Sequence, residues 1–143
     1  MKKLALFVSL IVFGCSGFQI KDDATTKLLA YAAGKTMAIT VNKIKPEVDK
    51  ELTNEWVMFM ERNAGNEIVQ PSSMIPFFNH IVMITTSYEF DKYGLIGDFS
   101  MLLSIYGGET NEVGQMTAIN PVPLAILKTF ELGYANGRAV ARE

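Results

Sequence analysis

Residue types that carry much of protein chemistry are scarce in this 143-residue sequence, which has one cysteine, one histidine and one tryptophan. A single cysteine excludes a disulfide framework within the chain, so stability must come from packing. Most metal sites need several ligands, and here only carboxylates remain to join His80. We therefore predict no metal ion and no cofactor, and expect His80 to be partly buried and paired with a backbone group or a tyrosine.

An excess of basic charge is also lacking. The chain has 13 Lys and Arg against 15 Asp and Glu, and loss of the two lysines at its N-terminus would make it more acidic. The nearest approach to a basic cluster, Lys43 to Lys50, is interleaved with acidic residues. Nucleic-acid binding needs clustered Lys and Arg that release counterions, so we predict that nucleic acid is not a partner.

No uninterrupted apolar segment reaches the roughly 20 residues of a membrane-spanning helix. The apolar stretch from Met74 to Tyr106 is interrupted by polar and charged residues, including Asn79 and Lys92. Packing within a helical bundle is the simpler interpretation of this stretch. Insertion of Met74 to Phe78 into a lipid surface is an alternative.

What the N-terminus does contain is typical of a secretory signal. Lys2 and Lys3 precede an apolar run from Leu4 to Phe13, and small residues follow it. A ten-residue helix spans only about 15 Å of a hydrocarbon core about 30 Å thick, so this run is too short for a stable anchor. The residues that end this run and follow it, Val12-Phe13-Gly14-Cys15, resemble the lipobox of bacterial lipoproteins.

The resemblance covers the first fifteen or so residues and implies lipidation of Cys15. A diacylglyceryl group would be attached to the Cys15 thiol, and residues 1–14 would then be removed as a signal peptide. Two acyl chains suffice for stable membrane anchoring. Residues 15–21 would form the lipidated tether, and Ser16 resembles signals that permit transfer to the outer membrane in diderm bacteria. The alternative is an ordinary secretory signal in which the cysteine is incidental.

Residues 22–143 are expected to form a single helical domain. Asp22 and Asp23 offer caps for a first helix, whose apolar residues recur at helical spacing beside a stripe of small residues. Pro46 ends this helix and begins a second, and Gly65 is expected to cap the second helix at its C-terminus. The apolar stripe of the first helix comprises Leu29, Ala33, Met37, Val41 and Ile44, its small-residue stripe comprises Ala30, Gly34 and Ala38, and the buried face of the second comprises Val48, Leu52, Trp56, Phe59 and Met60.

The second half of the sequence predicts up to three further helices. Ser72 or Ser73 can cap a third, although residues 81–88 are rich in β-branched side chains and a strand is the alternative. A short fourth helix follows the break at 91–94 and ends at Gly107-Gly108, and residues 109–119 are expected to form a polar surface loop. Asn120-Pro121 is expected to begin the last helix, which runs to about Ala141. The expected buried residues are Phe77, Ile81, Ile84 and Tyr88 of the third helix, Leu95, Phe99, Leu102, Leu103 and Tyr106 of the fourth, and Ile126 or Leu127, Phe130, Tyr134 and Ala141 of the last.

The predicted fold class is therefore all-α, a compact bundle of four to five helices. Small residues suggest how two of these helices meet. Gly34 on the first helix, with Gly133 or Gly137 on the last, would permit a close approach of the two backbones. The alternative is that these glycines only lower helix propensity, by about 1 kcal/mol each.

Motifs that resemble catalytic or binding chemistry are weak. Gly34-Lys35-Thr36 lacks the earlier glycine of a phosphate-binding loop and has helical surroundings, so Lys35 is interpreted as a solvated helix residue. The acidic group Glu89, Asp91 and Asp98 has Lys92 in its middle, and a solvated turn is the simpler interpretation. We assign no catalytic residue.

The sequence thus predicts a non-enzymatic structural or interaction module of the cell envelope, anchored to a membrane through Cys15 and contacting an envelope protein. Trp56, Phe59 or Phe77-Phe78 would supply the contact if exposed, although core packing is the simpler interpretation. One alternative is a module that binds a small apolar ligand or lipid between helices, which a cavity lined by Met37, Met60 and Met83 would favour. A second alternative is a hydrolase, which a cleft joining His80 with Asp91 and Asp98 would favour.

Overall fold

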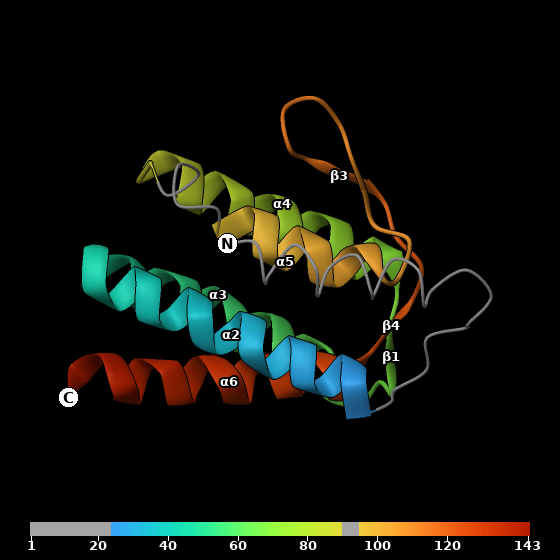
Figure 1. Cartoon of the computed structure of the whole chain (residues 1–143). Coiled ribbons are helices and arrows are strands. Elements are labelled where there is room, and N and C mark those ends of the chain that lie inside the picture. The colour runs from blue at the N-terminus through green and yellow to red at the C-terminus, as the bar shows by residue number, and fades with distance from the viewer. Residues whose placement is uncertain (1–23, 90–94) are drawn as a thin grey trace.

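The computed structural model of the chain describes residues 24–89 and 95–143 (Figure 1). The predicted signal peptide, the tether and Cys15 lie outside the described residues, as do Asp91 and the side chain of Asp98. What was predicted for them stays a prediction.

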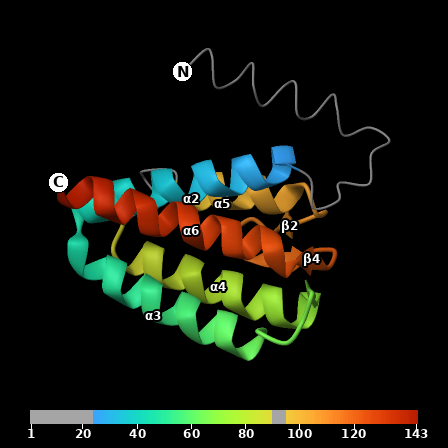
Figure 2. The ribbon, with the colours of Figure 1, turned by 90° about the horizontal axis from the view of Figure 1, so that it is seen from below.

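Five helices make up most of the described chain, which confirms the predicted helical bundle. They are α2 (Ala24–Ile44), α3 (Pro46–Arg62), α4 (Pro71–Ser87), α5 (Leu95–Ser104) and α6 (Leu124–Arg142). The chain direction reverses from each of the first four helices to the next, and α6 returns beside α2 in the same direction (Figures 1 and 2). The bundle also carries two small antiparallel sheets, which pair β1 (Ile68–Val69) with β4 (Val122–Pro123) and β2 (Glu109–Thr110) with β3 (Met116–Ala118).

The close crossing of α2 and α6 confirms the expectation drawn from the small residues. A methyl group on Gly34 would overlap the carbonyl oxygen of Phe130, and one on Gly133 would overlap the carbonyl oxygen of Tyr31. Gly137 lies against the Lys35 carbonyl oxygen in the same way. The obstructing atoms belong to backbone, so glycine is required at these positions if the two helices are to keep their separation.

This crossing also decides which face of α2 is buried. The expected apolar stripe is only partly correct, because Leu29 and Ala33 are half-buried and Ile44 is 39% exposed. The fully buried residues instead follow the small-residue stripe, together with Met37 and Val41. Backbone contact with α6 outweighs side-chain size in setting the orientation of the helix.

Both ends of α3 have a clear local cause, although the predicted cap at Gly65 is wrong. Pro46 is the first helical residue, as expected, and acidic residues occupy the first turn, where they complement the helix dipole. The helix ends at Arg62, and the following Asn63 donates from its side chain to the carbonyl oxygen of Phe59 at 2.9 Å. The buried Asn63 amide thus satisfies one of the carbonyl groups at the end of the helix. The prediction had instead placed a left-handed cap at Gly65.

The third helix, α4, runs through the segment for which a strand was the alternative. It begins at Pro71, so the predicted cap at Ser72 or Ser73 is wrong. Within the β-branched stretch Ile81 and Ile84 are buried, and the Thr85 hydroxyl donates to the Ile81 carbonyl oxygen at 3.0 Å. Burial of one helical face outweighs the modest β propensity of these residues.

The segment between α5 and α6 departs most from the prediction. Gly107 adopts a positive φ of 76° after α5, as its position suggested, but residues 109–119 contain the β2–β3 hairpin in place of an irregular loop. Asn79 on α4 holds this hairpin, since its side chain accepts from the Met116 N–H at 2.7 Å and donates to the Met116 carbonyl oxygen at 3.2 Å.

Asn120-Pro121 does not begin the last helix. Val122 and Pro123 pair with β1, and α6 begins at Leu124, whose N–H donates to the Glu67 carbonyl oxygen at 2.8 Å. Val122 and its partner Val69 are both completely buried. This apolar pairing at the base of the bundle outweighs the local start signal.

Aromatic rings fill the centre of the bundle. Phe59 and Phe77 stack with ring centroids 3.9 Å apart, and Trp56 lies 4.9 Å from Phe130. Phe59, Phe77 and Phe78 are each at most 7% exposed, so they cannot serve as protruding anchors. The core interpretation is confirmed for these three phenylalanines, whereas Trp56 is half-buried. Insertion of Met74 to Phe78 into a lipid surface is excluded because Phe77 and Phe78 are buried.

Candidate functional site

A cavity of about 230 Å³ lies between α3 and α6 and reaches inward to α2, α4 and α5. Its walls are largely apolar, and polar side chains are confined to α3 and α6. The lining residues are Met37 of α2, Leu52, Thr53, Trp56 and Val57 of α3, Ile81 of α4, Phe99 of α5, and Phe130, Glu131, Tyr134, Ala135 and Arg138 of α6. The exposed residues Val57, Glu131 and Ala135 place its mouth on the surface between these two helices.

Trp56 forms one wall of the cavity in a fixed orientation. Its indole Nε1 donates to the Glu131 carboxylate at 2.6 Å, and its ring packs against Phe130 and, at 6.2 Å, Phe99. The hydrogen bond ties α3 to α6 across the mouth. A large flat apolar ring held in this way is a preformed contact surface for a ligand.

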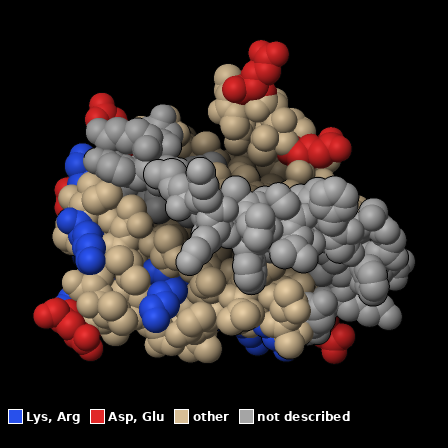
Figure 3. Space-filling model, in the orientation of Figure 1, with Lys and Arg blue, Asp and Glu red and all other residues tan. Residues whose placement is uncertain are grey.

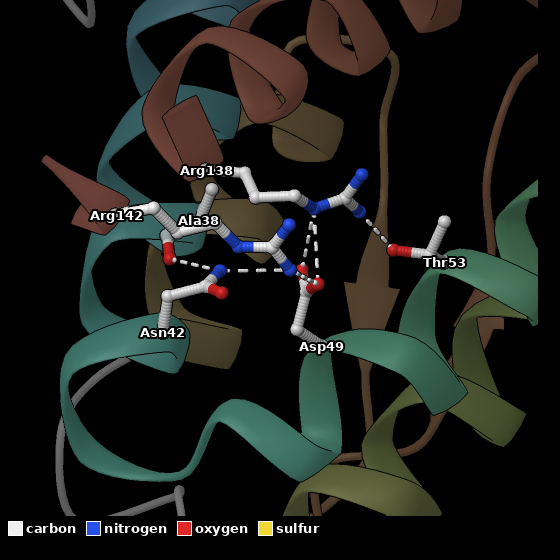
Figure 4. A network of polar contacts seen from close by, with 6 residues as sticks. All are labelled: Ala38, Asn42, Asp49, Thr53, Arg138 and Arg142. Carbon is white, nitrogen blue, oxygen red and sulfur yellow. Dashed lines mark hydrogen bonds and ion pairs between the residues drawn. The ribbon is translucent and has the colours of Figure 1, made fainter. Parts of the chain in front are cut away.

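A polar cluster lies at the other end of the α6 wall (Figure 4). Arg138 Nε lies 2.9 Å from one oxygen of Asp49, and its Nη2 donates to the hydroxyl of Thr53. Arg142 Nη2 lies 3.5 Å from the same Asp49 oxygen, and the Asn42 side-chain amide donates to the other oxygen at 3.2 Å. Three helices therefore converge on one carboxylate.

Burial of Asp49 explains why it needs so many partners. Its side chain is only 5% exposed, and an unpaired carboxylate in such a place would be expensive. The two arginines are the more exposed members, at 25% and 65%. Counted together, Asp49, Arg138 and Arg142 carry a formal charge of +1 at this end of the cavity.

Tyr134 lies on α6 between the Trp56 wall and this cluster. Its hydroxyl oxygen is buried and makes no hydrogen bond of ordinary geometry among the described residues, and its weak acceptor is the nearby Asp49 carboxylate. Burial is the main cause that raises the pKa of Tyr134 far above its ordinary value, and the neighbouring Asp49 carboxylate raises it further. The hydroxyl therefore stays protonated and is a buried donor in the cavity wall.

Trp56 and Met37 line this cavity, but the described residues singled out for possible catalytic or phosphate-binding chemistry do not. Lys35 lies on helix α2, as expected for a helix residue. His80 Nε2 lies 3.4 Å from the Glu55 carboxylate, so the predicted backbone or tyrosine partner is wrong. Glu55 lies one turn from Leu52 and Met58 on α3, and no periodicity distinguishes it as a histidine partner. Glu89 is exposed and adopts a positive φ of 61° just after α4.

The expected methionine-lined cavity is correct only in part. Met37 lines the cavity, but Met60 does not, and Met83 is 56% exposed. Within residues 24–89 and 95–143, no group of three or more His, Cys, Asp or Glu side chains is arranged to hold a metal ion. Over the same ranges, no helix combines the length and apolar character needed to cross a bilayer.

Sequence reasoning missed the polar residues of the site altogether. Asp49 and Arg138 are 89 residues apart, and Trp56 and Glu131 are 75 apart. Asp49, Glu131 and Arg138 each look like ordinary surface residues on their own helices, and Trp56 was expected only as a core residue or an anchor. Only a correct placement of α3 against α6 would have joined them.

The chain was also compared with known proteins. No protein-family model, no curated protein and no solved structure matches it. Its function is therefore argued from its own residues.

Proposed function

We propose that the protein is a lipid-anchored module of the cell envelope that binds a small apolar ligand in the cavity between α3 and α6. The anchor is the acylated Cys15 that the lipobox-like sequence implies. The proposal contains no chemical conversion of the ligand. The observation that carries it is an apolar, partly open cavity bordered by core aromatic rings.

The volume of the cavity sets the size of the ligand. An apolar cavity of about 150 Å³ accommodates benzene, whereas sites for drug-sized molecules begin at about 300 Å³. At about 230 Å³, the cavity fits one aromatic ring with a substituent or a short alkyl chain. A ligand of this kind would replace missing packing contacts around Phe99 and Phe130.

A protein partner is less well supported by the described surface. The large apolar residues that are exposed there are all aliphatic or methionine, with no aromatic ring among them. On the described part of the face in Figure 3, Lys and Arg are scattered and form no continuous patch. Interface hot spots favour Trp, Tyr and Arg, and here Trp56, Tyr134 and Arg138 line the cavity.

Fluorescence of Trp56 provides a direct test, because it is the only tryptophan and lines the cavity. Bromobenzene, whose heavy atom quenches indole emission, is titrated into the full-length protein. If bromobenzene binds in the cavity, we expect Trp56 emission to fall with increasing bromobenzene and then to level off at a value above zero. Quenching that stays linear in bromobenzene would indicate collisions only and would contradict the proposal.

Two substitutions on α6 give a matched control. Ala135 lines the cavity, whereas Ala139 lies on the exposed part of the same helix, outside the cavity. Ala135→Phe should fill the space and abolish saturable quenching, while Ala139→Phe should leave it unchanged. Equal effects of the two variants would show that the probe binds elsewhere.

A further inference from the structure

The proposed function leaves the chemical class of the ligand open, and the two ends of the α6 wall differ in charge. Glu131 and Arg138 are seven residues apart on α6, which corresponds to about 10 Å along the helix. The Glu131 carboxylate already accepts from Trp56. The opposite end holds the group formed by Asp49, Arg138 and Arg142, with its formal charge of +1.

Donor capacity at the arginine end exceeds what the protein uses. A guanidinium carries five N–H donors. Among the described residues, the bonds of Arg138 engage Nε and Nη2, and its other terminal nitrogen carries no dashed line in Figure 4. That nitrogen contributes two N–H groups without an acceptor, on a side chain that lines the cavity.

The Tyr134 hydroxyl adds a donor of a different kind. It is buried, lines the same cavity and makes no hydrogen bond of ordinary geometry within the described part of the chain, while the Asp49 carboxylate nearby is a weak acceptor for it. A ligand acceptor in the cavity would offer this hydroxyl a stronger hydrogen bond than it has in the free protein. Arg138 and Tyr134 thus line the cavity with donor capacity that the described residues do not fully use.

We propose, building on the proposed function, that the natural ligand is a short-chain apolar carboxylic acid bound as its carboxylate. The carboxylate accepts from Arg138 and from the Tyr134 hydroxyl, and the alkyl chain extends along α6 toward Trp56. Asp49 keeps Arg138 in place and lowers the local positive charge without cancelling it. A cationic head group is disfavoured at this end by Arg138 and Arg142.

A pair of brominated probes with the same chain tests this assignment. The full-length protein is titrated with 8-bromooctanoate and with 8-bromooctan-1-ol at pH 7, and quenching of Trp56 is followed. The carboxylate gains charge-assisted bonds that the alcohol lacks, so we expect it to bind about tenfold more tightly or better.

Tyr134→Phe removes the hydroxyl donor from the cavity wall, together with its weak interaction with Asp49. It should reduce the preference for the carboxylate over the alcohol by several-fold, while leaving alcohol binding nearly unchanged. Arg138→Lys is the second variant, because it retains a positive charge beside Asp49 but loses the spare guanidinium nitrogen. It should also reduce the preference.

The failures of the two proposals are distinguishable. If both probes bind with equal affinity, or the alcohol binds more tightly, the carboxylate assignment is overturned and the apolar site stands. If wild-type preference is unchanged in both variants, the assigned donors are wrong. If neither probe nor bromobenzene gives saturable quenching, the proposed function fails, and this inference fails with it.

Discussion

Replacing Gly133 by alanine measures how far the bundle depends on the close approach of α2 and α6. The substitution has two opposed effects. Alanine is favoured over glycine within a helix by about 1 kcal/mol, which alone would stabilise the protein. The added methyl group, however, would overlap the backbone carbonyl oxygen of Tyr31.

The size of the overlap decides the sign. Overpacking in a filled core costs about 1–3 kcal/mol, and the upper end applies because a backbone atom cannot move aside as a side chain would. After subtraction of the helix propensity gain, we expect a net loss of about 2 kcal/mol. For a domain of this size, that corresponds to a fall in Tm of about 8 °C.

Gly97 provides the matched control. It lies within α5, is exposed, and a methyl group there would meet no atom within 4 Å. Gly97→Ala should therefore stabilise the protein by up to about 1 kcal/mol. Thermal and urea unfolding followed by circular dichroism would measure both variants. Stabilisation of similar size in Gly133→Ala and Gly97→Ala would refute the reasoning, because it would mean that the helices are not in backbone contact.

Four further predictions concern single residues. Cys15→Ala should abolish incorporation of labelled palmitate in bacteria that process lipoproteins, and unchanged labelling would contradict lipidation. Asn79→Ala should lower the free energy of unfolding by about 1–3 kcal/mol, because it removes two hydrogen bonds to the Met116 backbone. Amide exchange in the β2–β3 hairpin should then accelerate, and unchanged exchange would show that these two hydrogen bonds do not hold the hairpin. Asp49→Ala should destabilise the protein by about 2 kcal/mol, because it leaves partly exposed arginines unpaired, and adding Arg138→Met should recover part of the loss in a double-mutant cycle. Burial raises the pKa of Tyr134 in the native state, so above the ordinary tyrosine pKa of about 10 the unfolded state loses this proton first and stability falls as pH rises. Urea unfolding between pH 9 and 11 should therefore show a shallower decline for Tyr134→Phe than for the wild type, and equal declines would contradict the raised pKa.

Helix positions were predictable because apolar residues recur at helical spacing over long segments. Pro46 marks the start of α3, and Gly107 lies in the turn after α5, because each residue has a backbone preference that few others share. The close crossing was one of two interpretations of the small residues one turn apart on α2 and α6, and the positions of Gly34 and Gly133 against backbone carbonyl groups favour it over a mere loss of helix propensity.

The short strands were not predictable in the same way. Two-residue strands such as Val122–Pro123 are too short for an alternating pattern, and their partner, Ile68–Val69, lies more than 50 residues away in the sequence. Asn120-Pro121 does favour the start of a helix when only neighbouring residues are considered. Burial of Val122 against Val69 outweighed it, and this contact depends on the tertiary arrangement.

The cavity was the least predictable feature. It is space left where five helices fail to fill the bundle, and no single residue encodes it. Met37 was named only as part of the cavity that would favour ligand binding, Tyr134 was assigned only to a buried helix face, and Arg138 received no role. Their significance depends on their positions relative to Asp49 and Thr53 on another helix.

Contacts between a bound ligand and the cavity wall test the central claim most directly. Isotope-filtered nuclear Overhauser spectra of the labelled full-length protein with unlabelled toluene would report which protein protons lie near the ligand. The account predicts cross-peaks to the Ile81 methyl groups and the Phe130 ring. Cross-peaks only to exposed side chains such as Val113, or none at all at saturating toluene, would contradict it.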